Sequence, residues 1–111
     1  MEKIRLLDCT LRDGGYINDW NFGARTIRNL LARLVDAKTD LIEVGFLRNC
    51  TYDPNRTLFN NVAELKSLLP DNRKKSRFAA MALHNQYDVE KLEENDGTLD
   101  VIRVTFHDYD A

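Results

Sequence analysis

The sequence lacks the features that mark membrane, secreted and nucleic-acid-binding proteins. No apolar run approaches the roughly 20 residues that a membrane-spanning helix needs. Residues 1–3 lead directly into a strand-like run, without the apolar core of a signal peptide. Lys and Arg number 16 against 18 Asp and Glu, for a formal net charge of −2, whereas nucleic-acid binders usually carry a basic excess. We therefore expect a cytoplasmic protein with neither a membrane nor a nucleic acid as partner.

Cysteine is scarce as well. Only Cys9 and Cys50 occur, and their spacing matches no zinc-binding pattern. In a chain without an export signal, two thiols are expected to be reduced. The 111 residues, 43% of them hydrophobic, are enough for one small domain, and we expect residues 1–111 to form a single unit without an internal boundary.

The sequence does contain a regular alternation of two hydrophobic periods. Strand-like apolar runs occupy residues 4–9, 41–46, 78–83 and 101–106. Between them, apolar residues at helical spacing predict helices over residues 24–37, 62–69 and 89–94. Strands that alternate with helices in this way predict a parallel sheet with right-handed crossovers.

Two of the predicted strands have one apolar face and one polar face. Glu43 is expected opposite the apolar face of its strand, which is formed by Ile42, Val44 and Phe46. In the last strand the polar face consists of Arg103, Thr105 and His107. A barrel whose interior becomes polar at its C-terminal mouth would show this pattern. The alternative is a sheet with one solvated face.

We therefore predict an α/β fold of the (β/α)8 TIM-barrel type, of which this chain covers about the first four strands and three helices. The chain stops at Ala111, directly after a predicted strand. We expect this end to be the boundary of a truncated N-terminal half-barrel.

A run of charged and small residues, Asp8-Cys9-Thr10-Leu11-Arg12-Asp13-Gly14-Gly15, directly follows the first predicted strand. It lies on the side of the sheet where α/β proteins build their sites. A plainer interpretation is a turn closed by the two glycines, with a local ion pair between Arg12 and Asp13.

The pattern Asp-x-Thr-Leu-Arg-Asp-Gly over residues 8–14 resembles the signature of the DRE-TIM metallolyases. This family includes 4-hydroxy-2-oxovalerate aldolase, hydroxymethylglutaryl-CoA lyase, and the isopropylmalate and homocitrate synthases. Residues 42–46 resemble the family's second strand, and residues 101–107 resemble the fourth strand of its aldolase branch. The resemblance covers essentially the whole chain, but only the first half of the family's barrel.

The resemblance implies a role for each residue of the charged pair. Asp13 would be a ligand of a divalent cation, Mn²⁺ or Mg²⁺, because such hard ions prefer carboxylate oxygens. Arg12 would bind the substrate and stabilise the negative oxygen of the enolate that forms when a carbon–carbon bond breaks. The family's further metal ligands, a His-x-His pair, do not occur in this sequence, so the remaining ligands are expected outside this chain.

Further residues are implicated less directly. Glu43 and Thr105 are expected to help bind the substrate, although Glu43 could instead be a buried carboxylate paired with Arg103. His107 is expected to line the mouth as a catalytic residue, or to be an ordinary hydrogen-bonded histidine, and His84 ends the third strand in an analogous place.

Tyr16 stands where the aldolase branch carries a histidine and the acyl-CoA branches carry a glutamine. A tyrosine can relay a proton in catalysis but is a poor base near neutral pH, with an unperturbed pKa of about 10. Trp20 and Tyr16 are expected either to pack at the rim of the barrel or to shape the substrate pocket.

We predict that the full-length parent is a metal-dependent lyase that cleaves a 4-hydroxy-2-oxo acid to pyruvate and an aldehyde through an enolate. One alternative is a Claisen-type lyase or synthase acting on an acyl-CoA. Another is a non-catalytic half-barrel that forms a homodimer or binds a partner. The 111-residue chain alone is expected to be inactive. By family analogy only, an aldehyde dehydrogenase is a further expected partner.

Overall fold

The computed structural model describes residues 5–83, 86–87, 90, 92 and 96–105. Its elements follow one another as β1 (Leu7–Asp8), α1 (Thr10–Asp13), the short 3₁₀ helix η1 (Gly14–Tyr16), α2 (Ala24–Asp36), β2 (Leu41–Leu47), β3 (Leu58–Phe59), α3 (Val62–Lys66), β4 (Arg77–Leu83) and β5 (Val101–Thr105). The predicted helix over 89–94 lies mostly outside the described residues, as do His84 and His107.

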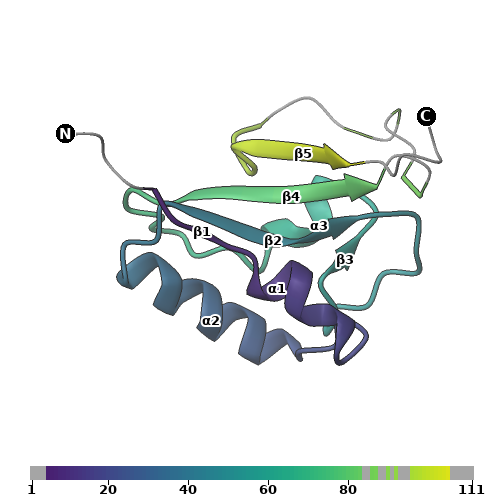
Figure 1. Ribbon diagram of the computed structural model, residues 1–111, viewed down its shortest axis with the longest axis horizontal. Helices are drawn as coiled ribbons and strands as arrows, with labels where there is room; N and C mark the ends of the chain where they lie inside the picture. The colour runs from purple at the N-terminus through teal and green to yellow at the C-terminus, as the bar shows by residue number, and fades with distance from the viewer. Residues whose placement is uncertain (1–4, 84–85, 88–89, 91, 93–95, 106–111) are drawn as a thin grey trace.

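The strands form one parallel sheet (Figure 1). Their order is β1-β2-β4-β5, with β3 also paired to β2. β1 pairs with the first residues of β2 and β3 with its last residues, while β4 pairs along the other side. β1 and β3 therefore follow one another along the same edge of β2. The predicted α/β fold with a parallel sheet is confirmed, as expected for the first part of a barrel.

Helices α2 and α3 cover one face of the sheet, and the main core lies between these two layers. The apolar side of α2 contributes Ile27, Leu31 and Val35, and α3 contributes Leu65, all of them buried. Each such side chain stabilises the fold by about 1.5–3 kcal/mol relative to exposure. The 3.6-residue period of these positions explains why the sequence predicted α2 almost to the residue.

Strand β2 contains a bulge that the sequence pattern did not predict. Glu43 pairs with Ala79 and Phe46 with Met81, so three steps along β2 match two steps along β4. The extra residue reverses the alternation, and Phe46 therefore packs with Trp20 and Met81 rather than with the main core. The prediction that Phe46 shares a face with Ile42 and Val44 was wrong for this reason.

Gly45 makes this bulge possible. Its φ is 150°, and a Cβ at this position would collide with the carbonyl oxygen of Thr57, just before β3. The same carbonyl accepts a hydrogen bond from the amide of Phe46 at 3.1 Å. β3 therefore reaches the edge of β2 only because position 45 has no side chain.

The first strand is shorter and more exposed than expected. Within the predicted run of residues 4–9, only Leu7 and Asp8 are in strand conformation among the residues that the structure describes. The side chains of Leu6 and Leu7 are exposed. β1 has β2 as a neighbour on one side only. The exposure of Leu6 and Leu7 follows from this position, because the described β1 forms an edge of the sheet.

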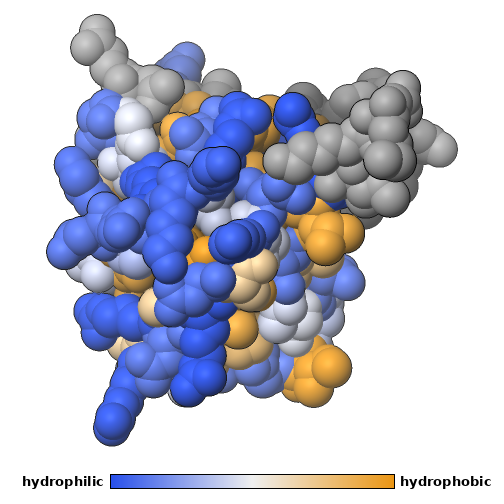
Figure 2. All heavy atoms as spheres, turned by 90° about the vertical axis from the view of Figure 1, so that its left-hand side faces the viewer, coloured by the Kyte–Doolittle hydropathy of each residue, from blue (hydrophilic) through white to orange (hydrophobic). Residues whose placement is uncertain are grey.

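The amino ends of the strands lie on a largely hydrophilic face (Figure 2). A cavity of about 290 Å³ opens there, lined by Arg5, Asp40, Leu41, Lys75 and Arg77. Lys74, in the basic segment before β4, pairs with Asp36 at 2.8 Å. Among the described residues, no helix combines the length and apolar character that crossing a membrane requires.

Candidate functional site

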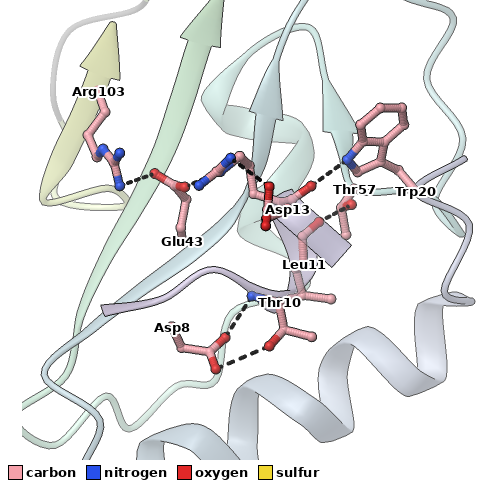
Figure 3. A network of polar contacts seen from close by, with 9 residues as sticks. Asp8, Thr10, Leu11, Asp13, Trp20, Glu43, Thr57 and Arg103 are labelled. Atoms are coloured by element: carbon pink, nitrogen blue, oxygen red, sulfur yellow. Dashed lines mark hydrogen bonds and ion pairs between the residues drawn. The ribbon is translucent and has the colours of Figure 1, made fainter. Parts of the chain in front are cut away.

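The motif residues form a short helix at the carboxyl end of β1. Helix α1 begins at Thr10, whose amide donates to Asp8 Oδ1 at 3.1 Å and whose hydroxyl contacts Asp8 Oδ2 at 3.2 Å (Figure 3). Asp8 thus satisfies an amide that the first turn of a helix leaves without a backbone partner. The plainer interpretation from the sequence was a turn; the structure has one helical turn that continues into η1.

Arg12 and Arg103 lie on either side of Glu43. Arg12 Nε donates to Glu43 Oε1 at 2.5 Å, and Arg103 Nη1 lies 3.3 Å from Glu43 Oε2 (Figure 3). The Glu43 side chain is completely buried. Side chains from α1, β2 and β5 therefore meet at one carboxylate, on the face of the sheet opposite α2 and α3.

The two oxygens of Glu43 are held differently. Oε1 accepts a hydrogen bond from Arg12, whereas Oε2 accepts none among the described residues, although Arg103 pairs with it electrostatically. Of the two interpretations of Glu43 from the sequence, the structure shows the pairing with Arg103 and adds a second cation, Arg12, while a role of Glu43 in substrate binding stays a prediction. Because the carboxylate has no exposed surface, Glu43 cannot contact a bound molecule directly. It can affect such a molecule through Arg12 and Arg103, which it pairs with.

Arg12 remains charged across the accessible pH range. Burial works against the charged guanidinium, but the hydrogen bond and charge of Glu43 outweigh it and raise the pKa of Arg12 above its ordinary value. Its contacts with Glu43 and Asp13 use two of the five N–H groups of a guanidinium. Further N–H groups are left to bind an anionic oxygen.

Asp13 is the accessible carboxylate of the site. Its side chain is 64% exposed, and Oδ1 lies 3.4 Å from Arg12 Nη1. An exposed carboxylate fits a hard divalent cation as one oxygen ligand. Within the described part of the chain, however, no group of three or more acidic, histidine or cysteine side chains could hold a metal ion.

Aromatic rings form one wall of the site. The ring of Tyr16 is 65% exposed and meets Trp20 edge-on, with centroids 4.8 Å apart. Trp20 in turn meets Phe46 at 5.6 Å, and the guanidinium of Arg12 lies 5.9 Å from the Phe46 ring centre. The bulge in β2 therefore brings an aromatic ring against Arg12, on the same side of the strand as Glu43.

Two side chains that the sequence did not single out as anchors hold the backbone of the motif. Thr57 Oγ1 donates to the carbonyl of Leu11 at 2.7 Å, and Trp20 Nε1 donates to the carbonyl of Arg12 at 2.6 Å (Figure 3). Both carbonyls lie near the end of α1, where helices leave carbonyl groups without partners. The paired glycines Gly14 and Gly15 were a signal of close packing here, because a Cβ on Gly15 would overlap the indole.

Thr105 lies at the end of β5, where it pairs with Leu83 in register. Strand alternation puts Thr105 on the same face as Arg103. Thr105 is partly buried, and its role in substrate binding stays a prediction. The structure therefore brings together Arg12, Asp13 and Glu43, with Tyr16 beside Trp20, and places Arg103 as a further member.

Comparisons with known proteins give one informative likeness. Neither the models of known protein families nor the curated protein sequences give a match. A crystal structure described as "the N-terminal domain of a putative aldolase from Bacteroides vulgatus" is similar to this chain, with a TM-score of 0.65 and 29% sequence identity. The match covers 91% of this chain but only 35% of that one. The chain thus resembles the N-terminal part of an aldolase-like protein in fold and in sequence.

Proposed function

We propose that this chain is the arginine- and aspartate-bearing part of a divalent-metal-dependent lyase of the DRE-TIM type. Its substrate would be a 4-hydroxy-2-oxo acid, cleaved to pyruvate and an aldehyde. The observation that carries this proposal is the fixed, charged Arg12, held by buried Glu43 beside the exposed carboxylate of Asp13. The likeness to the N-terminal domain of the Bacteroides vulgatus protein supports the lyase class.

The reaction requires a cation at the substrate's keto oxygen. The bond between the third and fourth carbons breaks as the fourth-carbon hydroxyl gives its proton to a base and becomes the aldehyde. The electron pair passes to the keto oxygen as an enolate, which then takes a proton at the third carbon to give pyruvate. Arg12 would donate to that oxygen as its charge grows, and its pairing with Glu43 means that little reorganisation is needed.

Asp13 would supply one ligand to Mn²⁺ or Mg²⁺, with the other ligands provided by residues outside this chain. When bound, such a cation polarises the keto and carboxylate oxygens of a 2-oxo acid. The exposure of the Asp13 carboxylate next to Arg12 supports this role. Tyr16, exposed next to Trp20, would relay a proton rather than act as the base.

The test is enolisation of pyruvate by the protein at the full length its gene encodes. Proton NMR in D₂O follows exchange of the pyruvate methyl group with Mn²⁺ or Mg²⁺ present, and coupled release of pyruvate follows cleavage of 4-hydroxy-2-oxo acids. Arg12→Lys is expected to lower kcat about 10²–10³-fold, the usual cost of losing one donor to a developing oxyanion.

Arg28→Lys is the matched control, because Arg28 lies on α2, outside the site, and makes a long contact of 3.5 Å to the Ser67 carbonyl. Its activity should equal that of the unmodified protein. Exchange of acetyl-CoA but not pyruvate would replace the substrate class with the acyl-CoA one. No metal-dependent exchange of either compound, or equal rates in Arg12→Lys, would overturn the proposal.

A further inference from the structure

Trp20 occupies an unusual backbone conformation next to the site. Asp19 has φ 56° and Trp20 has φ 59°, so two consecutive residues with side chains adopt the left-handed region. This region is unfavourable for residues other than glycine and rarely contains successive residues. Such strain persists only where the surrounding structure enforces it.

The segment before β3 enforces the conformation. Arg56 Nε donates to the Asp19 carbonyl at 3.0 Å, and Arg56 Nη2 lies 3.1 Å from Asp19 Oδ1. The amide of Thr57 donates to the Trp20 carbonyl at 2.9 Å. Residues 19 and 20 are thus attached to the same segment whose Thr57 hydroxyl holds the Leu11 carbonyl.

The result is that an indole, 9% exposed, lies directly over Gly15 with its N–H directed at the Arg12 carbonyl. Packing against Phe46, Leu58 and Met81 would be satisfied by any large apolar ring. The 2.6 Å hydrogen bond is the part of this arrangement that only an N–H donor supplies. The carbonyl it holds belongs to the peptide between Arg12 and Asp13.

We propose that Trp20 is a positioning residue for Arg12 and Asp13. By holding the carbonyl that joins them, the indole N–H fixes the rotation of their shared peptide, so that guanidinium and carboxylate face the same bound oxygens. The catalytic consequence rests on the proposed function, whereas the effect on Arg12 itself does not. The two are therefore measured separately.

The first measurement is NMR of the ¹⁵N-labelled 111-residue chain. The sequence has one tryptophan, so its single indole N–H signal should exchange slowly with solvent. The Arg12 Nε–H signal, identified by its disappearance in Arg12→Lys, should be protected by Glu43. Trp20→Phe keeps a ring but removes the donor, and we expect the Arg12 Nε–H to exchange at least about tenfold faster.

Two matched variants separate positioning from packing. Leu58→Val reduces the packing around Trp20, Phe46 and Met81 but leaves the Arg12 carbonyl and its indole donor in place. It should leave the Arg12 Nε–H protected from exchange. Gly15→Ala must displace the indole, whereas Gly14→Ala adds its methyl group at ordinary contact distance, 3.8 Å from Thr10. Only Gly15→Ala should reproduce the loss of protection.

The second measurement uses the native-length protein. Trp20→Phe should lower kcat for pyruvate exchange about tenfold with KM changed less than twofold, because misplaced groups lose transition-state contacts. Leu58→Val should retain kcat. An unmodified protein without exchange activity would count against the proposed function only. Rapid exchange of the unmodified indole N–H, or unchanged Arg12 protection in Trp20→Phe and Gly15→Ala, would overturn the role of Trp20.

Discussion

At the scale of single residues, the site depends on one buried charge. Glu43 is completely enclosed and paired with two arginines, while Arg103 remains 37% exposed and Arg12 16% exposed. The alternation of side chains along β2 correctly predicted that Glu43 lies opposite the apolar face of the strand. The sequence alone left open whether Glu43 binds a substrate or pairs with a cationic side chain. That choice depended on which side chains the other strands bring near, which local patterns do not encode.

Glu43→Gln should destabilise the fold by about 2 kcal/mol. This is less than the ~3–5 kcal/mol for breaking a fully buried pair, because water reaches part of both arginines. Urea unfolding at neutral pH measures the difference. Asp36→Asn, which breaks the exposed pair with Lys74, is the control and should cost less than about 1 kcal/mol. Equal decreases in the free energy of unfolding of the two variants would contradict the claim that the buried Glu43 pairs stabilise the fold more than an exposed ion pair does.

The charge of Arg12 also determines what a pH profile of activity can contain. Burial opposes its charge, but the hydrogen bond and charge of Glu43 raise the folded pKa of Arg12 above its ordinary value. The stabilisation from this pair is therefore complete below that value and is lost only as pH rises through the raised pKa. Any ionisation seen near neutral pH in the proposed reaction must come from another group.

At the scale of elements, periodicity predicted the long segments and failed at the short ones. α2, β2, β4 and β5 have enough apolar positions at a constant spacing for the pattern to identify them. β3 has only two residues, and the β2 bulge changes the spacing within a strand. Both depend on Gly45 meeting Thr57, a contact between residues twelve positions apart in the chain.

Gly45→Ala tests this meeting point of β2 and β3. The added Cβ collides with the Thr57 carbonyl and sits at a φ that favours glycine, so we expect a loss of more than about 2 kcal/mol. Thermal or urea unfolding gives the value. Gly14→Ala has helical φ and places its methyl group at ordinary contact distance, so it should change stability by less than about 1 kcal/mol. A Gly45→Ala protein as stable as Gly14→Ala would mean that the bulge does not hold β3.

Helix α3 is tied to the segment before β5 by Asp96. Hydrogen bonds from Thr98 and Lys66 lower the pKa of Asp96 below its ordinary value. Because the pKa is lowered in the folded state, this pairing stabilises the fold above about pH 4, and the stabilisation is lost as pH falls through the lowered pKa. Asp96→Asn should therefore weaken the protein at pH 6 and have less effect at pH 3, as measured by urea unfolding. A difference that grows towards low pH would contradict the pairing.

At the scale of the whole molecule, the described sheet has two edges, formed by β1 with β3 and by β5. Side chains of β5 differ in surroundings: Arg103 pairs with Glu43, whereas Val104 is 59% exposed. Exposed strand edges favour pairing with another strand. The similar structure belongs to a longer chain, of which the match covers 35%, and the completion of the sheet by further strands stays a prediction.

The 111-residue chain alone should bind Mn²⁺ weakly and should not enolise pyruvate. Asp13 offers a single carboxylate, and sites that hold such ions well use several oxygen ligands. Calorimetric titration should give a Kd weaker than about 1 mM, and a weaker one still in Asp13→Asn. In the native-length protein the same substitution should abolish metal-dependent exchange. Tight Mn²⁺ binding by the short chain would show that a second ligand set exists within it.

The position of Trp20 gives the site an optical signal of its own. The sequence has one tryptophan, and its indole contacts the Arg12 carbonyl and the ring of Tyr16. Fluorescence excited selectively in tryptophan therefore reports from the mouth of the site and from nowhere else in this chain. A paramagnetic ion such as Mn²⁺ close to Asp13 would quench that emission, whereas Mg²⁺ at the same position would not. Comparing the two ions would locate the metal without any assay of turnover.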